Sequence, residues 1–380
     1  MSFSLLKLAL LAGAAQGAIL ALLLWTRPVN REANRIFAFL LFLLTIHLTL
    51  VAFDERDFFM RFPHLSHLTW LIPVLYGPLT LIYVRRLTHI APAFQKKELL
   101  YFLPFLVWLV VQLPYYLQSA ADKRAYLGNW ELSVQDDFGL LNQLTNFIHI
   151  IFFGLCIRVY HRHEHRIPNF FSNLAEVRLL WLRRFLYITF SITVVGVFVF
   201  YAKKLDWPFL SALYPYHFLG VVVLIYWTAY QAIAHPVLFS AEEYPAAEDE
   251  TVEEAPTSRL DNATQETMAG QLKKLMEEEH LYLNSELTLK DLTDRLQSNK
   301  QYVSEVLNNY IGKTFYDFVN DYRIEAFKRL AADPVNSHLT LLALALEAGF
   351  NSKATFNAVF KKKTGLTPSA FYKEQHISEV

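Results

Sequence analysis

The sequence predicts an all-α protein, a seven-helix transmembrane bundle followed by a domain of two helix-turn-helix units joined by a long helix. Three observations predict this fold class. Apolar residues make up 54% of the chain and charged residues 18%, which is apolar for a soluble protein. Seven apolar segments, each of about 20 residues, lie in the first part of the chain. Beyond Asp261, apolar residues recur at the spacing of soluble helices.

The charge is unevenly distributed along the chain. Residues 1–240 hold 20 Lys and Arg against 12 Asp and Glu, residues 241–284 hold 3 against 12, and residues 285–380 hold 12 against 11. The formal neutrality therefore results from a basic, membrane-like part and an acidic connector. The single cysteine, Cys156, excludes an intramolecular disulfide and a site built from several cysteines.

The apolar segments are long enough to cross a hydrocarbon core about 30 Å thick. The first contains LAGAAQGA, which resembles a cleavage site, but the apolar run continues through LLLW, so we expect an uncleaved span. Four prolines stand within these spans: Pro73, Pro78, Pro104 and Pro114. Each removes a backbone donor and is expected to kink its span. Such kinks either make room for a ligand or reflect ordinary packing. The seven predicted spans lie near residues 5–25, 36–53, 65–84, 99–118, 138–160, 182–201 and 213–233.

The loops between these spans predict the orientation. Loops 1, 3 and 5 carry 11 Lys and Arg, whereas loops 2, 4 and 6 carry 6. Basic residues accumulate on the cytoplasmic side, which places the amino terminus outside. Seven crossings then put the carboxyl terminus in the cytoplasm. We therefore expect a multi-pass protein of the cytoplasmic (inner) membrane, with the lipid bilayer as a partner.

Polar residues inside the spans are candidates for membrane sensing. Asn142, Asn146 and His149 lie at i, i+4 and i+7 on one face of the fifth span, and His47 lies in the second. Buried polar residues in lipid are costly and often mark a site, here for a small molecule or an ion, but they also link helices by hydrogen bonds. Transport is a rival interpretation, and the absence of a detectable inverted repeat counts against it. A passive anchor is the other alternative.

Residues 241–258 are predicted to form a disordered tether. The stretch SAEEYPAAEDETVEEAPTS holds seven acids, two prolines and no basic residue, and cannot bury enough apolar surface to offset its chain entropy. A flexible chain of this length has an average reach of roughly 25 Å. The sequence is thus divided into a membrane domain (1–240), the linker (241–258), a helical lead-in (259–284) and a final domain (285–376).

The final domain begins with a helix-turn-helix pattern. Apolar residues share one face of LTLKDLTDRL, and Ser298 or Asn299 can cap a second helix that ends at Gly312. Ser298 and Gln301 also fit the S-x-x-Q capping box.

A second unit of the same kind follows. It consists of LTLLALALEA, a turn at Gly349 where positive φ is expected, and a helix from Ser352 to Lys363. Between the units, TFYDFVNDYRIEAFKRLAAD has apolar residues at helical spacing and is closed by Pro334, which predicts a long connecting helix.

These motifs resemble the DNA-binding domain of the AraC/XylS family of bacterial transcription regulators. The matching residues are LTLKDLTDRL with YVSEVLN, the connecting DYRIEAFKRL, and EAGFNSKATFNAVFKKKTGLTP. The layout is similar to the membrane-bound branch of that family, in which seven predicted spans precede the domain, and LYGPLTLIYV in the third span is typical of it. The sequence departs from the family pattern at Thr293, Ala343 and Ala358. The resemblance implies a one-component regulator that binds promoter DNA.

Helix-turn-helix units read the major groove with exposed residues early in each second helix. The net charge of residues 285–380 is only +1, so a single domain should bind DNA weakly. A homodimer on repeated half-sites is therefore expected. RNA polymerase is a further candidate partner. Lysines would contact phosphates and set affinity rather than sequence choice. The candidate base-contacting residues are Gln301, Tyr302, Ser304, Glu305, Asn308, Asn351, Lys353 and Asn357. The candidate phosphate-contacting residues are Lys300, Lys313, Lys361, Lys362 and Lys363.

An enzyme is the remaining rival class. In YHRHEHR, His161, His163 and His165 stand at alternate positions and could bind Zn or Ni, but a basic interfacial loop is the favoured interpretation. The sequence shows no phosphate-binding glycine loop, no kinase signature and no nucleophile motif. We therefore expect no catalytic residues, no metal and no cofactor.

Overall fold

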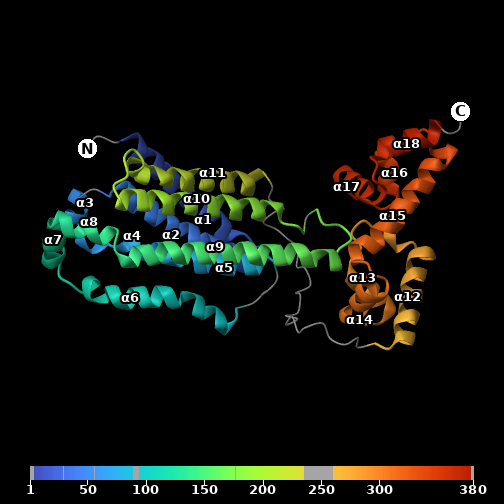
Figure 1. The fold of residues 1–380 in the computed structure, drawn as a ribbon, viewed down its shortest axis with the longest axis horizontal. Coiled ribbons are helices and arrows are strands. Elements are labelled where there is room, and N and C mark those ends of the chain that lie inside the picture. The colour runs from blue at the N-terminus through green and yellow to red at the C-terminus, as the bar shows by residue number, and fades with distance from the viewer. Residues whose placement is uncertain are drawn as a thin grey trace. The chain divides into compact units, whose positions relative to one another are not determined.

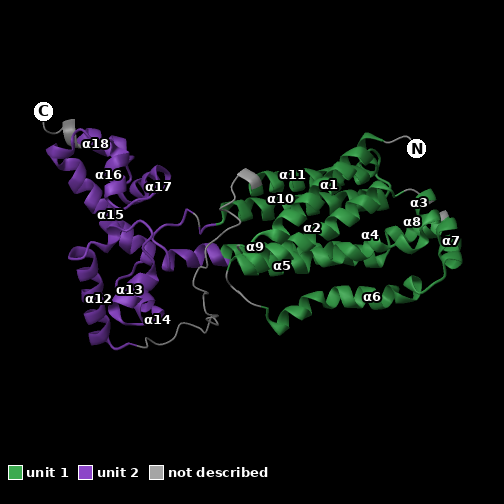
Figure 2. Ribbon diagram, turned by 180° about the vertical axis from the view of Figure 1, so that it is seen from behind, with its two compact units in different colours: residues 1–161, 179–249 green, residues 162–178, 250–380 purple. Residues whose placement is uncertain are grey.

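The computed structural model describes residues 4–28, 30–54, 56–88, 94–175, 177–234 and 260–377. Of these residues, 81% are helical and none belongs to a strand, so the predicted all-α class is confirmed. The acidic linker predicted at 241–258 lies outside the described ranges. Two compact units are formed, one by residues 1–161 with 179–249 and the other by residues 162–178 with 250–380 (Figure 2). The segment 162–178, which the sequence-based boundaries assign to the membrane domain, therefore packs with the carboxyl-terminal unit.

The first unit is a bundle of apolar helices (Figure 1). Seven segments within the described ranges are long and apolar enough to cross a membrane, as predicted: Leu5–Thr26, Arg31–Ala52, Pro63–Leu87, Lys96–Tyr116, Glu131–Asn169, Leu180–Lys204 and Ser211–Ala232. The elements from this part of the chain, including the short helices α3 and α7 between the apolar segments, are α1 (Leu5–Thr26), α2 (Arg31–Ala52), α3 (Arg56–Arg61), η1 (Pro63–Leu65), α4 (Leu68–Leu71), η2 (Ile72–Leu75), α5 (Tyr76–Leu87), η3 (Lys96–Phe102), α6 (Leu103–Tyr116), α7 (Ala120–Gly128), α8 (Trp130–Asp137), α9 (Leu140–Arg166), α10 (Leu180–Lys204), η5 (Ser211–His217) and α11 (Phe218–Ala234).

Proline interrupts the third of these segments, where the tighter turn η2 separates α4 from α5 at Pro73. Two glycines of α1 allow close packing of this helix. A Cβ atom on Gly13 would lie 2.6 Å from Val222 of α11, and one on Gly17 would lie 2.8 Å from the Thr45 hydroxyl of α2. Small residues four apart let apolar helices approach closely in the absence of a hydrophobic driving force.

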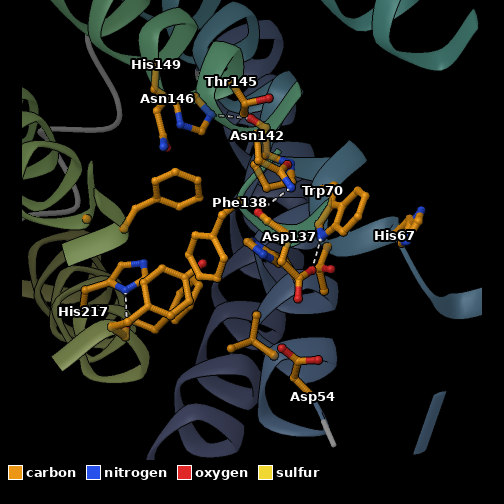
Figure 3. A pocket seen from close by; sticks show the side chains of 18 of the residues that line it. Asp54, His67, Trp70, Asp137, Phe138, Asn142, Thr145, Asn146, His149 and His217 are labelled. Carbon is orange, nitrogen blue, oxygen red and sulfur yellow. Dashed lines mark hydrogen bonds between the residues drawn. The ribbon is translucent and has the colours of Figure 1, made fainter. Parts of the chain in front are cut away.

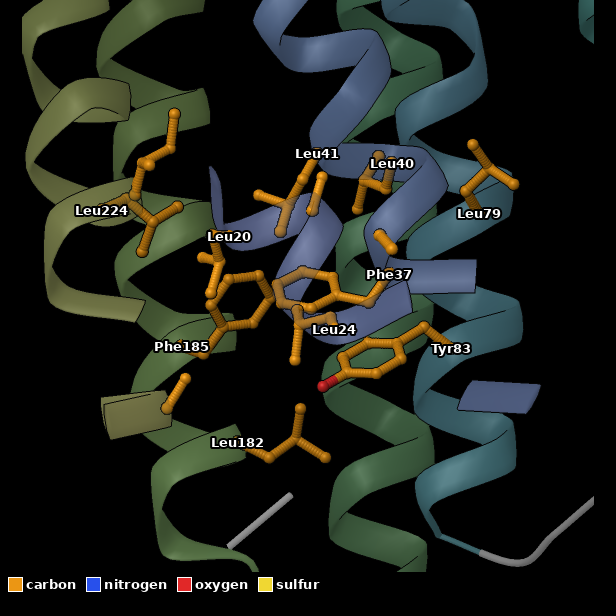
Figure 4. Close-up of a cluster of buried hydrophobic side chains, with 14 of the residues drawn as sticks. Leu20, Leu24, Phe37, Leu40, Leu41, Leu79, Tyr83, Leu182, Phe185 and Leu224 are labelled. Atoms are coloured by element: carbon orange, nitrogen blue, oxygen red, sulfur yellow. The ribbon is translucent and has the colours of Figure 1, made fainter. Parts of the chain in front are cut away.

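Buried aromatic and aliphatic side chains fill the centre of the bundle (Figure 4). The ring of Phe37 on α2 stacks on Tyr83 of α5 with centroids 4.6 Å apart, and meets Phe185 of α10 edge-on at 5.6 Å. Leu24 of α1 is fully buried beside them. One apolar cluster thereby joins α1 and α2 to α5 and α10, which lie further along the chain.

A buried ion pair ties η3 to α5. The Arg86 Nη2 atom donates to the Glu98 carboxylate at 2.7 Å, and both side chains are almost fully enclosed. Arg86 Nε also donates at 2.7 Å to Glu32 of α2, which is half exposed. Charges removed from water in this way are retained only when paired and hydrogen-bonded.

The second unit is built from short capped helices. Its elements are η4 (Ile167–Asn169), α12 (Asn262–Glu277), η7 (Leu281–Leu283), α13 (Leu289–Leu296), α14 (Lys300–Glu305), η8 (Val306–Tyr310), α15 (Phe315–Ala332), η9 (Pro334–Asn336), α16 (Leu341–Glu347), α17 (Lys353–Thr364) and α18 (Pro368–Ile377). The long connecting helix of the prediction is α15. The core of the second unit includes a group of aromatic side chains. The ring centroid of Phe327 on α15 lies 4.6 Å from that of Phe356 and 5.4 Å from that of Phe360, both on α17.

Candidate functional site

The first helix-turn-helix unit is formed by α13 and α14. The chain reverses after α13 through Gln297, whose φ is 48°. Asn299 then caps α14, because its side chain accepts from the Tyr302 backbone N–H at 2.8 Å. Of the two candidate caps, Asn299 is therefore the one that caps α14. The helix continues as a π-helical turn, Val306–Tyr310, and stops at Gly312 with φ of 73°.

The second unit is formed by α16 and α17. Gly349 in the turn has a φ of 95°, as predicted. A Cβ atom there would also lie 2.3 Å from the Tyr282 carbonyl oxygen, so only glycine fits on two counts. Ser352 caps α17 by accepting from the Thr355 N–H at 3.2 Å. Both units therefore present a capped second helix after a tight turn.

Residues 292–374 match the model of a family described as a helix-turn-helix domain. This part of the chain is an AraC-type helix-turn-helix domain. Such a domain suggests DNA-binding transcription regulation, and domains of this type are not usually enzymatic. No solved structure matches the chain. The match covers less than a quarter of the sequence.

The candidate base-contacting residues differ in exposure. Gln301 and Asn308 of the first unit, and Lys353 and Asn357 of the second, are exposed. Partly buried are Tyr302, Ser304, Glu305 and Asn351. Asn308 donates to Ser304 Oγ at 3.1 Å along the helix, which occupies one amide hydrogen. We therefore expect the four exposed side chains to make the first contacts with bases.

Three of the candidate phosphate-contacting lysines form ion pairs with α15. Lys363 lies 2.6 Å from Asp321 and 3.3 Å from Asp317, Lys362 lies 3.2 Å from Asp317, and Lys313 lies 2.7 Å from Asp321. Partial burial acts to raise the pKa of Asp317, but the neighbouring lysines and a hydrogen bond from Thr314 outweigh it, so its pKa lies below the usual value. Sequence reasoning missed this pairing, although both acids stand on one helix four residues apart.

These pairs affect how the lysines could bind phosphate. Ion pairs on a solvated surface contribute little, so a phosphate can compete for Lys362, whose side chain is 65% exposed. Lys363 is more enclosed and shares two carboxylates. Lys300 and Lys361 form no ion pair within the described part of the chain.

The polar residues of the membrane-type helices gather around one cavity of about 410 Å³ (Figure 3). His47, Asn142, Asn146 and His149 all line it, although they come from two helices. The structure also brings in residues that sequence reasoning missed, because they lie in other segments: Asp54, His67, Trp70, Asp137, Tyr214 and His217.

Hydrogen bonds fix most of these polar groups. His149 Nε2 donates to the Pro73 carbonyl at 2.8 Å, so the interrupted third segment supplies its acceptor. His47 Nδ1 lies 2.8 Å from the Tyr76 hydroxyl. The Asn146 Nδ2 group is buried and has no hydrogen-bond partner among the described residues. A buried unpaired donor is costly, and one beside a cavity is available to a ligand or water.

Apart from histidines and tyrosines, the ionisable residues that line the cavity are acidic. Asp54 and Asp137 line it, and Asp137 accepts one hydrogen bond from the Trp70 indole N–H at 3.1 Å. No Lys or Arg is among the described lining residues. The aromatic residues Trp70, Phe138 and Tyr214 also line the cavity. This lining disfavours an anion and suits a neutral or cationic molecule.

The histidine-rich stretch lies in a helix rather than in the expected basic loop, because α9 continues to Arg166. His161 Nε2 lies 2.9 Å from the Tyr187 hydroxyl, and His163 Nε2 donates to the Val177 carbonyl at 2.8 Å. Among the described residues, no group of three or more His, Cys, Asp or Glu side chains is arranged to hold a metal ion.

Proposed function

We propose that this chain is a membrane-anchored one-component transcription regulator. Its carboxyl-terminal domain binds promoter DNA through α14 and α17, and its apolar helices hold that domain at the cytoplasmic membrane. The observation that carries the proposal is the presence, in one chain, of an AraC-type domain and seven apolar helices. Resemblance to the membrane-bound branch of the AraC/XylS family supports the same assignment.

The direct test is selection of genomic DNA by the full-length protein in lipid nanodiscs. We expect a small set of fragments that share a repeated or palindromic motif, because one domain of low net charge binds DNA weakly. The control is a chain carrying Lys353→Ala and Asn357→Ala, which should keep its folding but lose the enrichment. Random recovery by a well-folded parent protein would refute DNA recognition.

The orientation is part of the proposal, since the DNA-binding domain must face the cytoplasm. The excess of Lys and Arg in loops 1, 3 and 5 supports an outside amino terminus. Reporter fusions after Ser119 should give a periplasmic signal, and fusions after Phe239 should give a cytoplasmic one. A periplasmic signal at Phe239 would separate the domain from DNA and exclude the function.

The cavity supports a sensing role for the membrane part over a passive anchor. Its lining joins an unpaired amide of Asn146 to carboxylates and aromatic rings, a combination that packing alone does not require. We propose that it binds a small neutral or cationic ligand. His149→Leu keeps roughly the side-chain volume but removes the hydrogen bond to Pro73. Membrane levels should stay normal and induction of the target promoter should change, whereas unchanged induction would exclude this site.

A further inference from the structure

A short segment between the fifth and sixth apolar helices packs into the DNA-binding unit. We call residues 170–173 the docked segment. The Phe170 carbonyl accepts from the Leu289 N–H at 2.9 Å, and the Ser172 N–H donates to the Leu287 carbonyl at 3.2 Å. Phe171 and Thr288 form an antiparallel bridge between these bonds. The docked segment thus lies as an extended piece along the residues that lead into α13.

Arg323 of α15 holds this segment from the other side. Its side chain is only 1% exposed. Nη1 donates to the Ser172 carbonyl at 3.1 Å and Nη2 to the Ser172 hydroxyl at 3.0 Å. The remaining acceptors belong to the DNA-binding unit, with Nε donating to the Tyr282 carbonyl at 2.9 Å and Nη2 to the Asn284 carbonyl at 2.8 Å.

The docked segment therefore completes the hydrogen bonding of a buried charge. Burial lowers the pKa of Arg323 to about 10, so the guanidinium stays charged at neutral pH. Asn320, fully buried one turn earlier, also donates to the Ser172 carbonyl at 3.2 Å. Loss of the segment would leave both side chains short of acceptors inside the protein, which is strongly unfavourable. An incidental surface contact would leave an arginine hydrated instead.

The docked segment does not use the helices expected to read DNA. The hydrogen bonds of Phe170, Ser172 and Asn173 reach α15, the start of α13 and the loop before it, and not α14 or α17. Docking therefore leaves the candidate base-contacting residues available. It also acts on α15, the helix that joins the two helix-turn-helix units.

One helix connects the cavity to the docked segment. Helix α9 carries Asn142, Asn146 and His149 in its first turns and ends at Arg166. Only the three residues of η4, Ile167–Asn169, separate its end from the docked segment. Arg166 follows His149 by 17 residues, which corresponds to roughly 25 Å of helix at about 1.5 Å per residue. A rigid helix can transmit a shift over such a length.

We propose that the docked segment is an integral part of the DNA-binding unit, and that α9 acts through it to control the position of α15. The docked state is the one that binds DNA. The proposal rests on the function proposed above. Besides the covalent acidic linker, it adds a second, hydrogen-bonded connection through which the membrane helices act on the domain.

A disulfide can test the docking. Residues that face each other across an antiparallel pair have Cα atoms about 4.5–5.5 Å apart, which suits a disulfide. Phe171→Cys with Thr288→Cys, in a chain carrying Cys156→Ala, should cross-link on oxidation in nanodiscs and keep DNA affinity within about twofold. The matched control is Ala175→Cys with Thr288→Cys, which should not cross-link. Failure of the first pair to cross-link would overturn the docking, and loss of DNA binding on cross-linking would overturn the assignment of the docked state.

Weakening the contact should weaken DNA binding. Ser172→Ala removes the hydroxyl that accepts from Arg323, and we expect about a tenfold loss of DNA affinity, the size of one charged hydrogen bond. Ala175→Ser, at an exposed position nearby, is the control and should change nothing. Equal affinity of the two variants would overturn the structural role of Ser172.

The route of coupling is tested by insertions. Four glycines between Arg166 and Ile167 should abolish the effect of His149→Leu on DNA affinity, while four glycines within the linker after Glu250 should leave that effect intact. The reverse pattern would show that the linker carries the signal and would overturn the proposal. If His149→Leu has no effect in the uninterrupted chain, the sensing role of the cavity fails and so does coupling through α9, while the cross-link still decides the docking.

Discussion

Replacing Gly349 by alanine should damage the second helix-turn-helix unit more than any other glycine-to-alanine change in it. The φ of this residue is 95°, and a left-handed backbone costs an L-residue about 1–2 kcal/mol. The new Cβ would also lie 2.3 Å from the Tyr282 oxygen and 2.9 Å from the Leu283 Cα. Both are backbone atoms, so the chain itself must move, at about 1–3 kcal/mol. Together these effects predict a loss of about 2–5 kcal/mol.

Two other glycines separate the causes. Gly365 has a φ of 79° with no atom within 4 Å of the new Cβ, so Gly365→Ala should lose only the conformational part, about 1–2 kcal/mol. Gly270 lies exposed in α12 with open space around it, and Gly270→Ala should stabilise that helix by about 0.5–1 kcal/mol. From the most to the least stable, the predicted order is thus Gly270→Ala, the wild type, Gly365→Ala and Gly349→Ala.

Hydrogen exchange is the suitable assay, because all seven tryptophans lie in the first 227 residues and their fluorescence would not report on this unit. Amide protection in α16 and α17 of the full-length protein in detergent gives the opening free energy of the unit directly. DNA affinity measured on the same samples should fall with it. Equal protection in Gly349→Ala and Gly365→Ala would refute the steric part of the reasoning, and no loss in either would refute the whole of it.

Three further predictions follow from the ion pairs and from the DNA-binding face. Glu98→Gln removes one partner of a fully buried pair and should destabilise the first unit by about 3–5 kcal/mol in detergent melting, whereas Glu32→Gln, half exposed, should cost less than about 1 kcal/mol. Lys353→Ala should relax base preference at one subsite by about 1–3 kcal/mol, while Lys362→Ala should weaken specific and random DNA alike and flatten the salt slope, and equal losses for both would contradict these roles. The pKa of Asp317 is lower in the folded protein than its usual value of 3.8, so the ionised carboxylate should stabilise the fold fully at any pH above 3.8. This stabilisation should be lost as the pH falls from 3.8 through the lower pKa of the folded state. In acid titrations followed by hydrogen exchange, the Asp317→Asn variant should lack this pH-dependent loss.

The number of long apolar helices and the turns of the helix-turn-helix units were predictable from the sequence, because their causes are local. A run of about 20 apolar residues is its own signal for a spanning helix. The predicted positive φ at Gly349 depends on residues within one turn of the chain, and the structure has it. The start of the following helix is also set locally, since Ser352 caps α17, which begins at Lys353. The shared face of Asn142, Asn146 and His149 likewise follows from helical spacing.

Contacts between distant segments were decided only by the tertiary structure. Nothing near Ser172 in the sequence indicates that its carbonyl and hydroxyl meet Arg323 more than a hundred residues later. The one local signal was the position of Arg323 itself, four residues after Val319 on the apolar face of the connecting helix. The carboxylates of Asp54 and Asp137 reach the cavity of His149 in the same non-local way. Periodicity specifies which face of a helix is buried, but the partner that covers it depends on how the whole chain packs.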